Sequence, residues 1–223
     1  MSHEQLLEFV QIVTNIVLAG ATTTLCWQLV IMKRQFNEEH RIQRNIYSNT
    51  MIRWWAEQIK REMAAARSFV ESLSDDQCRC LVESSPFTIS LDESDDASKK
   101  HRIYLLNKLR VCLESHYTTS VKEGNPVIEI GTDASNRIRS LCVSYLNSVE
   151  IVMSAWRHNL TDRAIIEEEF KYIVHLGKKY ELLSTFRKAS GGIESFPAIY
   201  EYIDHFNKNE NHLSPGSPQA KSH

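Results

Sequence analysis

Glycine and proline are scarce in this sequence: only 7 glycines and 5 prolines occur among its 223 residues. An all-β protein needs frequent turns, and turns draw heavily on these two residue types. Their scarcity therefore argues against an all-β fold and favours long helices. We predict an all-α protein, in which an N-terminal transmembrane helix continues into a cytosolic helical stalk and a small helical bundle.

An excess of positive charge is also missing. The formal net charge is -2 and the isoelectric point is near 6.5. A domain that binds the nucleic-acid backbone usually carries a clear basic excess. We therefore expect no specific binding of nucleic acid.

The cysteines lack the regular spacing of a disulfide framework or a zinc site. There are five of them, an odd and scattered set, at positions 26, 78, 80, 112 and 142. Cys78 and Cys80 form a C-x-C pair, but neither a second pair nor a nearby histidine completes a tetrahedral zinc site. We expect free thiols in a reducing cytosol, with no metal and no cofactor.

A long uncharged run lies near the N-terminus. Residues Phe9 to Met32 read FVQIVTNIVLAGATTTLCWQLVIM, without Asp, Glu, Lys or Arg. A helix of this length measures about 36 Å, enough to cross a hydrocarbon core of about 30 Å. A cleaved signal peptide is one alternative, but it needs a basic segment that is missing before this run. A buried helix of a soluble bundle is the other, and Gln11, Asn15 and Gln28 would suit it.

The charges that flank this run predict its orientation. Lys33 and Arg34 follow it directly, Arg41 and Arg44 lie further on, and no Lys or Arg precedes it. The positive-inside rule then places the residues after Met32 in the cytoplasm. We predict a single-pass protein of the inner (cytoplasmic) membrane, in contact with the lipid bilayer and with the bulk of the chain cytoplasmic.

Small and polar residues within the run indicate that the membrane helix associates with a second copy. Small residues four positions apart allow helices to approach closely, and amides hydrogen-bond between helices in lipid. We predict a homo-oligomer whose helices meet through Asn15, Ala19, Gly20, Thr23 and Thr24. The alternative is that small residues simply fill a single span. The sequence names no other protein partner.

Helical periodicity and changes in composition divide the chain into five predicted segments. They are a membrane anchor (1–34), an amphipathic helical stalk (35–84), an acidic loop (85–96), a helical bundle (97–207) and a disordered tail (208–223). Within the bundle we expect helices at about 97–121, 132–158 and 161–188, and a short helix from about 195 to 206. Ser74 and Gln77 have the spacing of a capping box, and Thr161 or Asp162 is expected to cap the helix that follows it.

The stretch from Ile138 to Lys188 resembles a bacterial, often prophage-encoded family, domain of unknown function 4760. The family pattern is a Tyr-Leu-Asn core followed by a glutamate, then a turn with Asp, then a helix that ends in Arg. The matching positions here are Tyr145, Leu146, Asn147, Glu150, Asp162 and Arg187. Members commonly have one N-terminal membrane helix. The resemblance implies this architecture and a prophage setting, with roles such as exclusion of other phages or host defence, but no established activity.

Tyr145, Asn147, Glu150 and Arg187 form a candidate polar network. Asn147 and Glu150 are three residues apart and share one helical face, and Arg187 is expected on the adjacent antiparallel helix. The functional interpretation is a polar site. The structural interpretation is a buried network that fixes helix register, and we favour it because no activated nucleophile, phosphate loop or paired metal ligands accompany these residues.

Arg110 and His116 are the candidate catalytic pair. Helical ribonucleases of the HEPN type use an Arg followed a few residues later by His, although Val111 stands here where that motif usually has a polar residue. Two functional hypotheses follow. The first is a non-enzymatic, membrane-anchored helical protein-interaction module in phage exclusion or bacterial defence. The alternative is a membrane-tethered ribonuclease that uses this pair.

Overall fold

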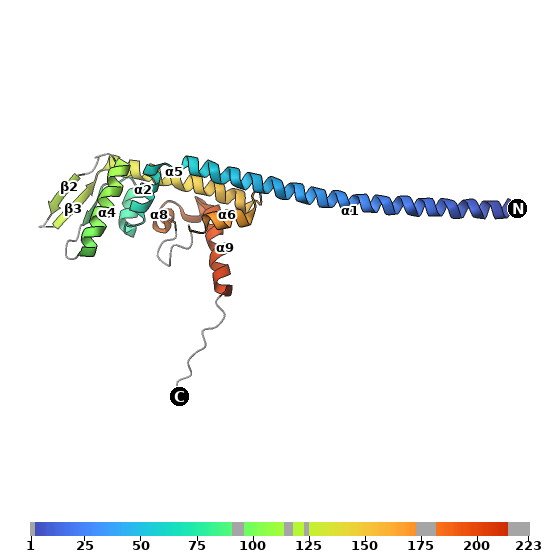
Figure 1. The fold of residues 1–223 in the computed structure, drawn as a ribbon. Helices are drawn as coiled ribbons and strands as arrows, with labels where there is room; N and C mark the ends of the chain where they lie inside the picture. Colours follow the sequence, from blue (N-terminus) through green and yellow to red (C-terminus); the bar gives the residue numbers. More distant parts are fainter. Residues whose placement is uncertain (1–2, 91–95, 114–117, 123–124, 173–181, 214–223) are drawn as a thin grey trace, which may run out of the picture. The chain divides into compact units, whose positions relative to one another are not determined.

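Helices account for most of the chain in the computed structural model (Figure 1). The structure describes residues 3–90, 96–113, 118–122, 125–172 and 182–213. The chain divides into an N-terminal unit, Met1–Ile46, and a second unit, Tyr47–His223, called here the helical unit. The predicted helical character and the long apolar N-terminal helix are confirmed in this coarse form.

The first helix, α1, runs from His3 to Gln58. Gly20 is the only glycine in it and it contains no proline, so no residue interrupts the backbone ladder. The helix stops before Lys60, whose extended backbone (φ -78°, ψ 157°) precedes α2, Arg61–Val70. The sequence predicted an amphipathic helical stalk over residues 35–84. The difference matters because residues from Tyr47 onward belong to the helical unit rather than to a separate stalk.

The remaining described helices of the helical unit vary in length, and α5, with 26 residues, is the longest of them. They are α3 (Asp75–Val82), α4 (Asp96–Leu113), α5 (Thr132–Arg157), α6 (Arg163–Phe170), α8 (Ser184–Ala189), the 3₁₀ turn η1 (Gly192–Glu194) and α9 (Pro197–Leu213). The capping box predicted at Ser74 is present, with the Ser74 and Gln77 side chains each bonded to the other's backbone N–H. The Asp162 side chain caps α6 by accepting from the Ala164 N–H at 3.0 Å.

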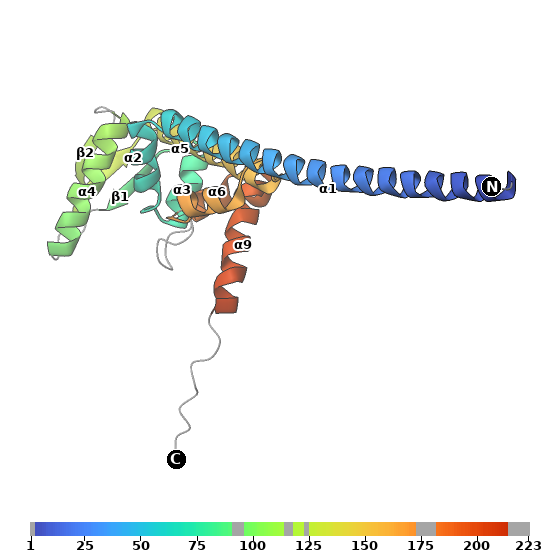
Figure 2. The same cartoon turned by 45° about the vertical axis from the view of Figure 1, so that its right-hand side comes forward.

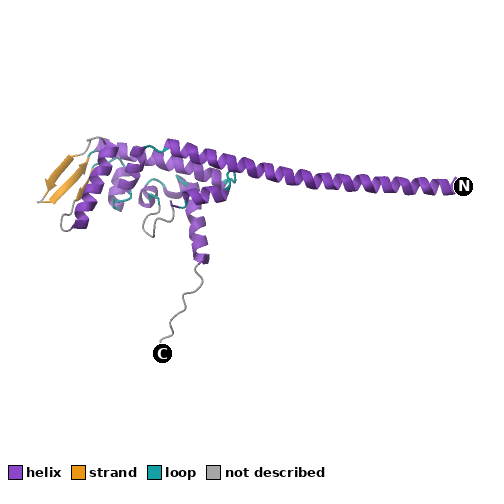
Figure 3. Ribbon diagram, viewed as in Figure 1, coloured by secondary structure: helices purple, strands orange, loops and turns teal. Residues whose placement is uncertain are grey.

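A small antiparallel sheet is the main departure from the predicted all-α fold (Figure 3). Its strands are β1 (Phe87–Ser90), β2 (Thr118–Lys122) and β3 (Asn125–Ile130), with β3 in the centre. Phe87 pairs with Ile130, and Thr119 pairs with Ile128. The predicted loop at 85–96 therefore contains a strand. The helix predicted at about 97–121 ends at Leu113, and part of its range is strand instead.

Helix α5 forms the centre of the helical unit. Its inward face buries Ile138, Cys142, Leu146, Val149, Val152 and Trp156, which recur at three- and four-residue steps as a packed helix requires. Within this unit the sheet and α4 lie toward one end of α5, and α6 and α9 lie toward the other (Figures 1 and 2).

The C-terminal part follows the predicted order with different boundaries. The helix expected at about 161–188 is divided: α6 ends at Phe170 and α8 begins at Ser184, while residues 173–181 lie outside the described residues. Gly191 and Gly192 follow the end of α8, with φ of 104° and 61°. The backbone of Gly191, with φ of 104°, is one that residues with side chains rarely adopt, so the position favours glycine. Helix α9 extends to Leu213, and the rest of the predicted tail, 214–223, lies outside the described residues.

Candidate functional site: the apolar helix and the polar clusters

The apolar part of α1 exposes its large side chains on every side. From Gln11 to Met32 each side chain that the structure describes is exposed. They include Ile16 and Val17 at 66 %, Trp27 at 67 % and Leu29 at 65 %. A surface helix of a soluble domain shows one apolar stripe, whereas a helix that is apolar all round belongs in a core or in lipid. Among the described residues, α1 is the one helix long and apolar enough to cross a membrane.

The three threonines in this segment satisfy their hydroxyls within the helix. Thr22, Thr23 and Thr24 each donate from Oγ1 to the carbonyl four residues earlier, at 2.8, 2.8 and 2.9 Å. In hydrocarbon an unsatisfied hydroxyl costs several kcal/mol, on the order of 4–8 by transfer to cyclohexane. These bonds remove that cost, so the Thr22–Thr24 run is compatible with a lipid environment.

The residues predicted to join membrane helices lie on two neighbouring rows of α1. Asn15, Ala19 and Thr23 follow one another at steps of four, and Gly20 and Thr24 form the next row. All five are exposed. A Cβ at Gly20 would meet no atom within 4 Å, so the fold of one copy does not itself require glycine there.

Tyr145 contacts a cation that sequence reasoning did not single out. Arg67 on α2 donates from Nη1 to Tyr145 Oη at 3.0 Å and from Nε to Glu71 Oε1 at 2.9 Å. Burial opposes the charge of Arg67, but Tyr145 and Glu71 together raise its pKa above the ordinary value. Burial also raises the pKa of Tyr145, against the attraction of Arg67. The cluster joins α2 to α5 as a phenol, a cation and a carboxylate.

Glu150 accepts hydrogen bonds from the first turn of α9. Its Oε1 accepts from the Ala198 N–H at 2.8 Å, and its Oε2 accepts from the Ile199 N–H at 3.0 Å. The N-terminus of a helix leaves donors without intrahelical partners and carries partial positive charge, which a carboxylate matches. Glu150 therefore caps α9 from another helix.

Arg187 and Asn147, the other two members of the predicted network, differ sharply in burial. Arg187 is fully buried, donates from Nε to the Leu182 carbonyl at 2.7 Å, and lies 4.4 Å from the centre of the Tyr200 ring. Asn147 is exposed on α5. The bonds of Tyr145, Glu150 and Arg187 described here run to α2, to α9 and to the segment before α8, so these three side chains fix helices at separate points.

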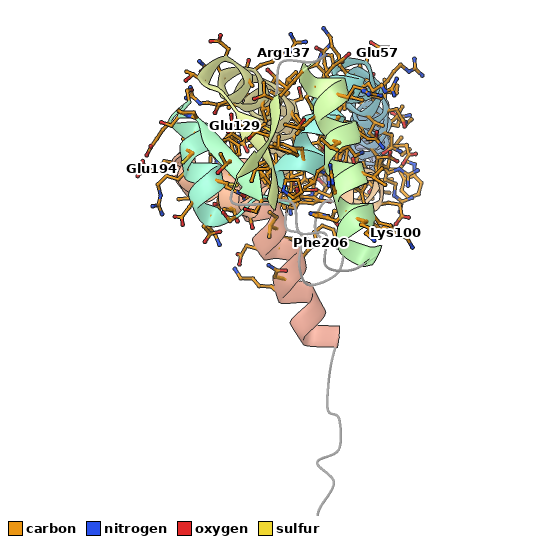
Figure 4. The ribbon with its side chains drawn as sticks, turned by 90° about the vertical axis from the view of Figure 1, so that its left-hand side faces the viewer. Glu57, Lys100, Glu129, Arg137, Glu194 and Phe206 are labelled. Atoms are coloured by element: carbon orange, nitrogen blue, oxygen red, sulfur yellow. The ribbon has the colours of Figure 1, made fainter. Side chains whose placement is uncertain are left out.

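Arg110, of the candidate catalytic pair, is exposed on α4. His116 lies outside the described residues, so the distance between the two side chains is not defined. Lys100, also exposed, lies on the same helix (Figure 4). The ribonuclease hypothesis stays a prediction.

A second polar cluster, around Trp156, was not predicted from the sequence. Trp156 Nε1 donates to Glu167 Oε1 at 3.0 Å, and His205 Nε2 lies 3.5 Å from the same oxygen. Arg163 stacks on the Trp156 ring at 4.7 Å. The cluster ties α5, α6 and α9 together, and no spacing rule in the sequence signals it, because the contacts join separate helices rather than successive turns of one helix.

One shallow hollow of about 360 Å³ lies between α3 and α8, lined by Asp75, Arg79, Thr185, Lys188 and Ala189. Arg79 is exposed and lies within 3.7 Å of Asp76, which is also exposed. The hollow is therefore part of the solvated surface. Among the described residues no three His, Cys, Asp or Glu side chains are grouped so that they could hold a metal ion.

Comparison of this chain with known proteins found no relative: no family model, no curated protein and no solved structure matches it. The resemblance stated on Tyr145, Asn147 and Glu150 stays a prediction.

Proposed function

We propose that this protein is a membrane-anchored helical module that holds its helical unit at the cytoplasmic face and acts through protein contacts rather than catalysis. The observation that carries the proposal is the exposure of apolar side chains all round α1 between Gln11 and Met32. Exposing this apolar surface to water is unfavourable, because removing each CH₂ group from water lowers the free energy by about 0.8 kcal/mol. A bilayer covers it completely.

The charges beyond the span support the proposed orientation. Lys33 and Arg34 follow the apolar segment and are exposed. Glu38 and Arg41, one turn further along, form an exposed ion pair at 2.7 Å. A cluster of basic residues at one end of a span is typical of its cytoplasmic side. Apart from Cys26, which lies in the apolar segment, the four cysteines of the helical unit are free thiols, which is compatible with the reducing cytoplasm.

A protein-contact role is supported by how the polar groups of the helical unit are used. The bonds described for Tyr145, Glu150 and Arg187 are made to helix backbones and to neighbouring helices, as structural contacts are. Exclusion of other phages, or host defence, is the setting that the resemblance implies. A phage plaquing assay on cells with and without the protein tests that setting.

Membrane fractionation tests the anchor directly. The full chain is compared with a version that begins at Lys33, which keeps every residue of the helical unit. Sodium carbonate at high pH should leave the full chain in the membrane pellet and release the truncated chain. Circular dichroism of the truncated chain confirms that it is folded. Release of the full chain would contradict the proposal.

A further inference from the structure

A face of α1 repeats every seven residues through the apolar segment and past its charged end. Counting from Asn15 as the first position, a, the positions a and d are occupied by Asn15, Leu18, Thr22, Leu25, Leu29, Met32 and Phe36, and then by Glu39, Gln43 and Ile46. Every one of these side chains is exposed; Leu18 is 64 % exposed, Leu25 60 % and Met32 62 %. Residues a and d of a sustained seven-residue repeat form the seam of a left-handed helix pair.

The apolar side chains of α1 beyond Arg34 identify the face that pairs, because that part of the helix lies outside lipid and lipid cannot account for its apolar surface. The large apolar side chains on residues 35–46 are Phe36, Ile42 and Ile46, exposed at 61 %, 49 % and 62 %. They occupy positions a, g and d of the same repeat, which all border the seam. Arg34 and Arg41 occupy position f, on the opposite side. Phe36 and Ile46 therefore continue the a and d rows of the apolar segment past the charged residues, with Glu39 and Gln43 on the same rows.

The polar residues of the span suit a second copy of the same chain. Two copies inserted with the same orientation run parallel, so each residue of a two-fold seam faces its own counterpart. An amide both donates and accepts hydrogen bonds, so Asn15 can satisfy Asn15 of the second copy. A single Asn at position a is the residue type that fixes register in such pairs, and an amide in lipid gains from a partner.

We propose that α1 pairs with α1 of a second copy as a parallel coiled coil whose seam runs from Asn15 through Phe36 to Ile46. The pairing rests on the proposed membrane anchor, which sets both copies in one orientation. Of the residues predicted from the sequence, the seam includes Asn15 and leaves Gly20 and Thr24 facing away from the partner. Glu39 falls at position d, so two carboxylates face each other in the pair and weaken it.

Disulfide crosslinking of the full chain in native membranes tests the seam. Cys26 and Cys80 are first replaced by Ser, since the other three cysteines are buried. Single cysteines are then placed on the seam, Leu29→Cys and Phe36→Cys, and off it, Ile31→Cys and Asn37→Cys. We expect about tenfold more crosslinked dimer from the seam positions under mild oxidation, since only those positions face the second copy. Equal yields from both sets, or crosslinks only to a different protein, would overturn the proposal.

A second pair of variants tests the seam without cysteine chemistry. Glu39→Leu should raise the dimer fraction several-fold, about three- to tenfold, because it removes the facing carboxylates. Glu38→Leu, at the outward position c, is the matched control and should leave the dimer fraction unchanged. Equal effects of the two changes would contradict the seam. Carbonate extraction of each variant separates the two ideas: extraction from the membrane refutes the anchor, whereas a retained protein without seam-specific crosslinks refutes only the pairing.

Discussion

Ser48 Oγ accepts a hydrogen bond from the backbone N–H of Asp162 at 2.7 Å, across 114 residues of sequence. Ser48 is fully buried near the C-terminal end of α1, and Asp162 is the residue that caps α6. The last turns of α1 are therefore part of the helical unit. A truncation that tests the anchor must begin before Tyr47, as one at Lys33 does.

Replacing Ser48 by Ala should lower the free energy of unfolding by about 1–3 kcal/mol, because the partly buried Asp162 N–H loses its acceptor. Urea unfolding of the chain that begins at Lys33 measures the change. Ser68→Ala is the matched control: its hydroxyl donates to the Ala64 carbonyl of its own helix at 3.0 Å and is exposed. The control should change the unfolding free energy by less than about 0.5 kcal/mol. Equal losses would mean that the Ser48 bond adds nothing.

Glu150→Ala should destabilise the docking of α9. Its carboxylate accepts from two N–H groups of the first turn, at 2.8 and 3.0 Å. Loss of a capping acceptor costs about 0.5–2 kcal/mol. Hydrogen exchange should show faster opening of the Ala198 and Ile199 amides. Glu201→Ala, which removes only a half-exposed ion pair with Arg157, should leave those amides protected.

A double-mutant cycle between Arg67 and Tyr145 should give a favourable coupling of about 1–2 kcal/mol, since the bond joins a buried cation to a phenol. The single variants are Arg67→Met and Tyr145→Phe, each measured by urea unfolding. Both side chains keep most of their apolar contact, so the cycle reports the polar bond at 3.0 Å. A coupling near zero would show that Arg67 is held by Glu71 alone.

Stability should fall in alkali because three buried thiols, those of Cys78, Cys112 and Cys142, resist ionisation, and burial raises the pKa of each. Burial raises the pKa of Cys78 from 9.0 to about 12, and burial raises the pKa of Cys112 to the same value. Each S–H also points to a backbone carbonyl, that of Val70 or of Glu62. A raised pKa in the folded state means that the stabilisation is complete below the unfolded value, near pH 9, and is lost as pH rises toward 12. Urea midpoints measured from pH 8 to 11 should therefore decline.

The control for this pH dependence is Cys80→Ala, which removes a thiol that is only half-buried. Its urea midpoints should decline with pH as steeply as those of the unmodified chain. Cys78→Ala should decline less steeply, because one thiol with a raised pKa is gone. Identical slopes for all three proteins would contradict a role of the Cys78 thiol.

The sequence predicted what local rules decide. The capping box at Ser74 and the cap at Asp162 both depend on neighbouring residues, and both are present. The apolar helix near the N-terminus was predictable for the same reason, because its length and composition are local properties.

The sheet and the polar clusters were not predicted because they depend on distant partners. The strand from Phe87 is stabilised by pairing with Ile130, forty-three residues away, and strand preference is set by such contacts more than by composition. The Thr-Thr-Ser-Val run of β2 contains β-branched residues, which favour a strand, but the helical periodicity of the preceding residues favoured extending the helix through it. The partner of Tyr145 could not be chosen among the arginines without the packing of α2 on α5.

Labelling of Cys26 with a charged maleimide is the most direct test of the membrane anchor. Cys26 is exposed on α1 within the apolar segment, so a charged reagent reaches it in water, whereas a bilayer would shield it. The full chain is examined in membranes opened to both sides, with Cys80→Ser as background and Asn37→Cys as a control just outside the proposed span. The account predicts that Asn37→Cys is labelled at once, while Cys26 is labelled only after the membrane is dissolved in denaturing detergent. Equal labelling of both positions in intact bilayers would contradict the anchor.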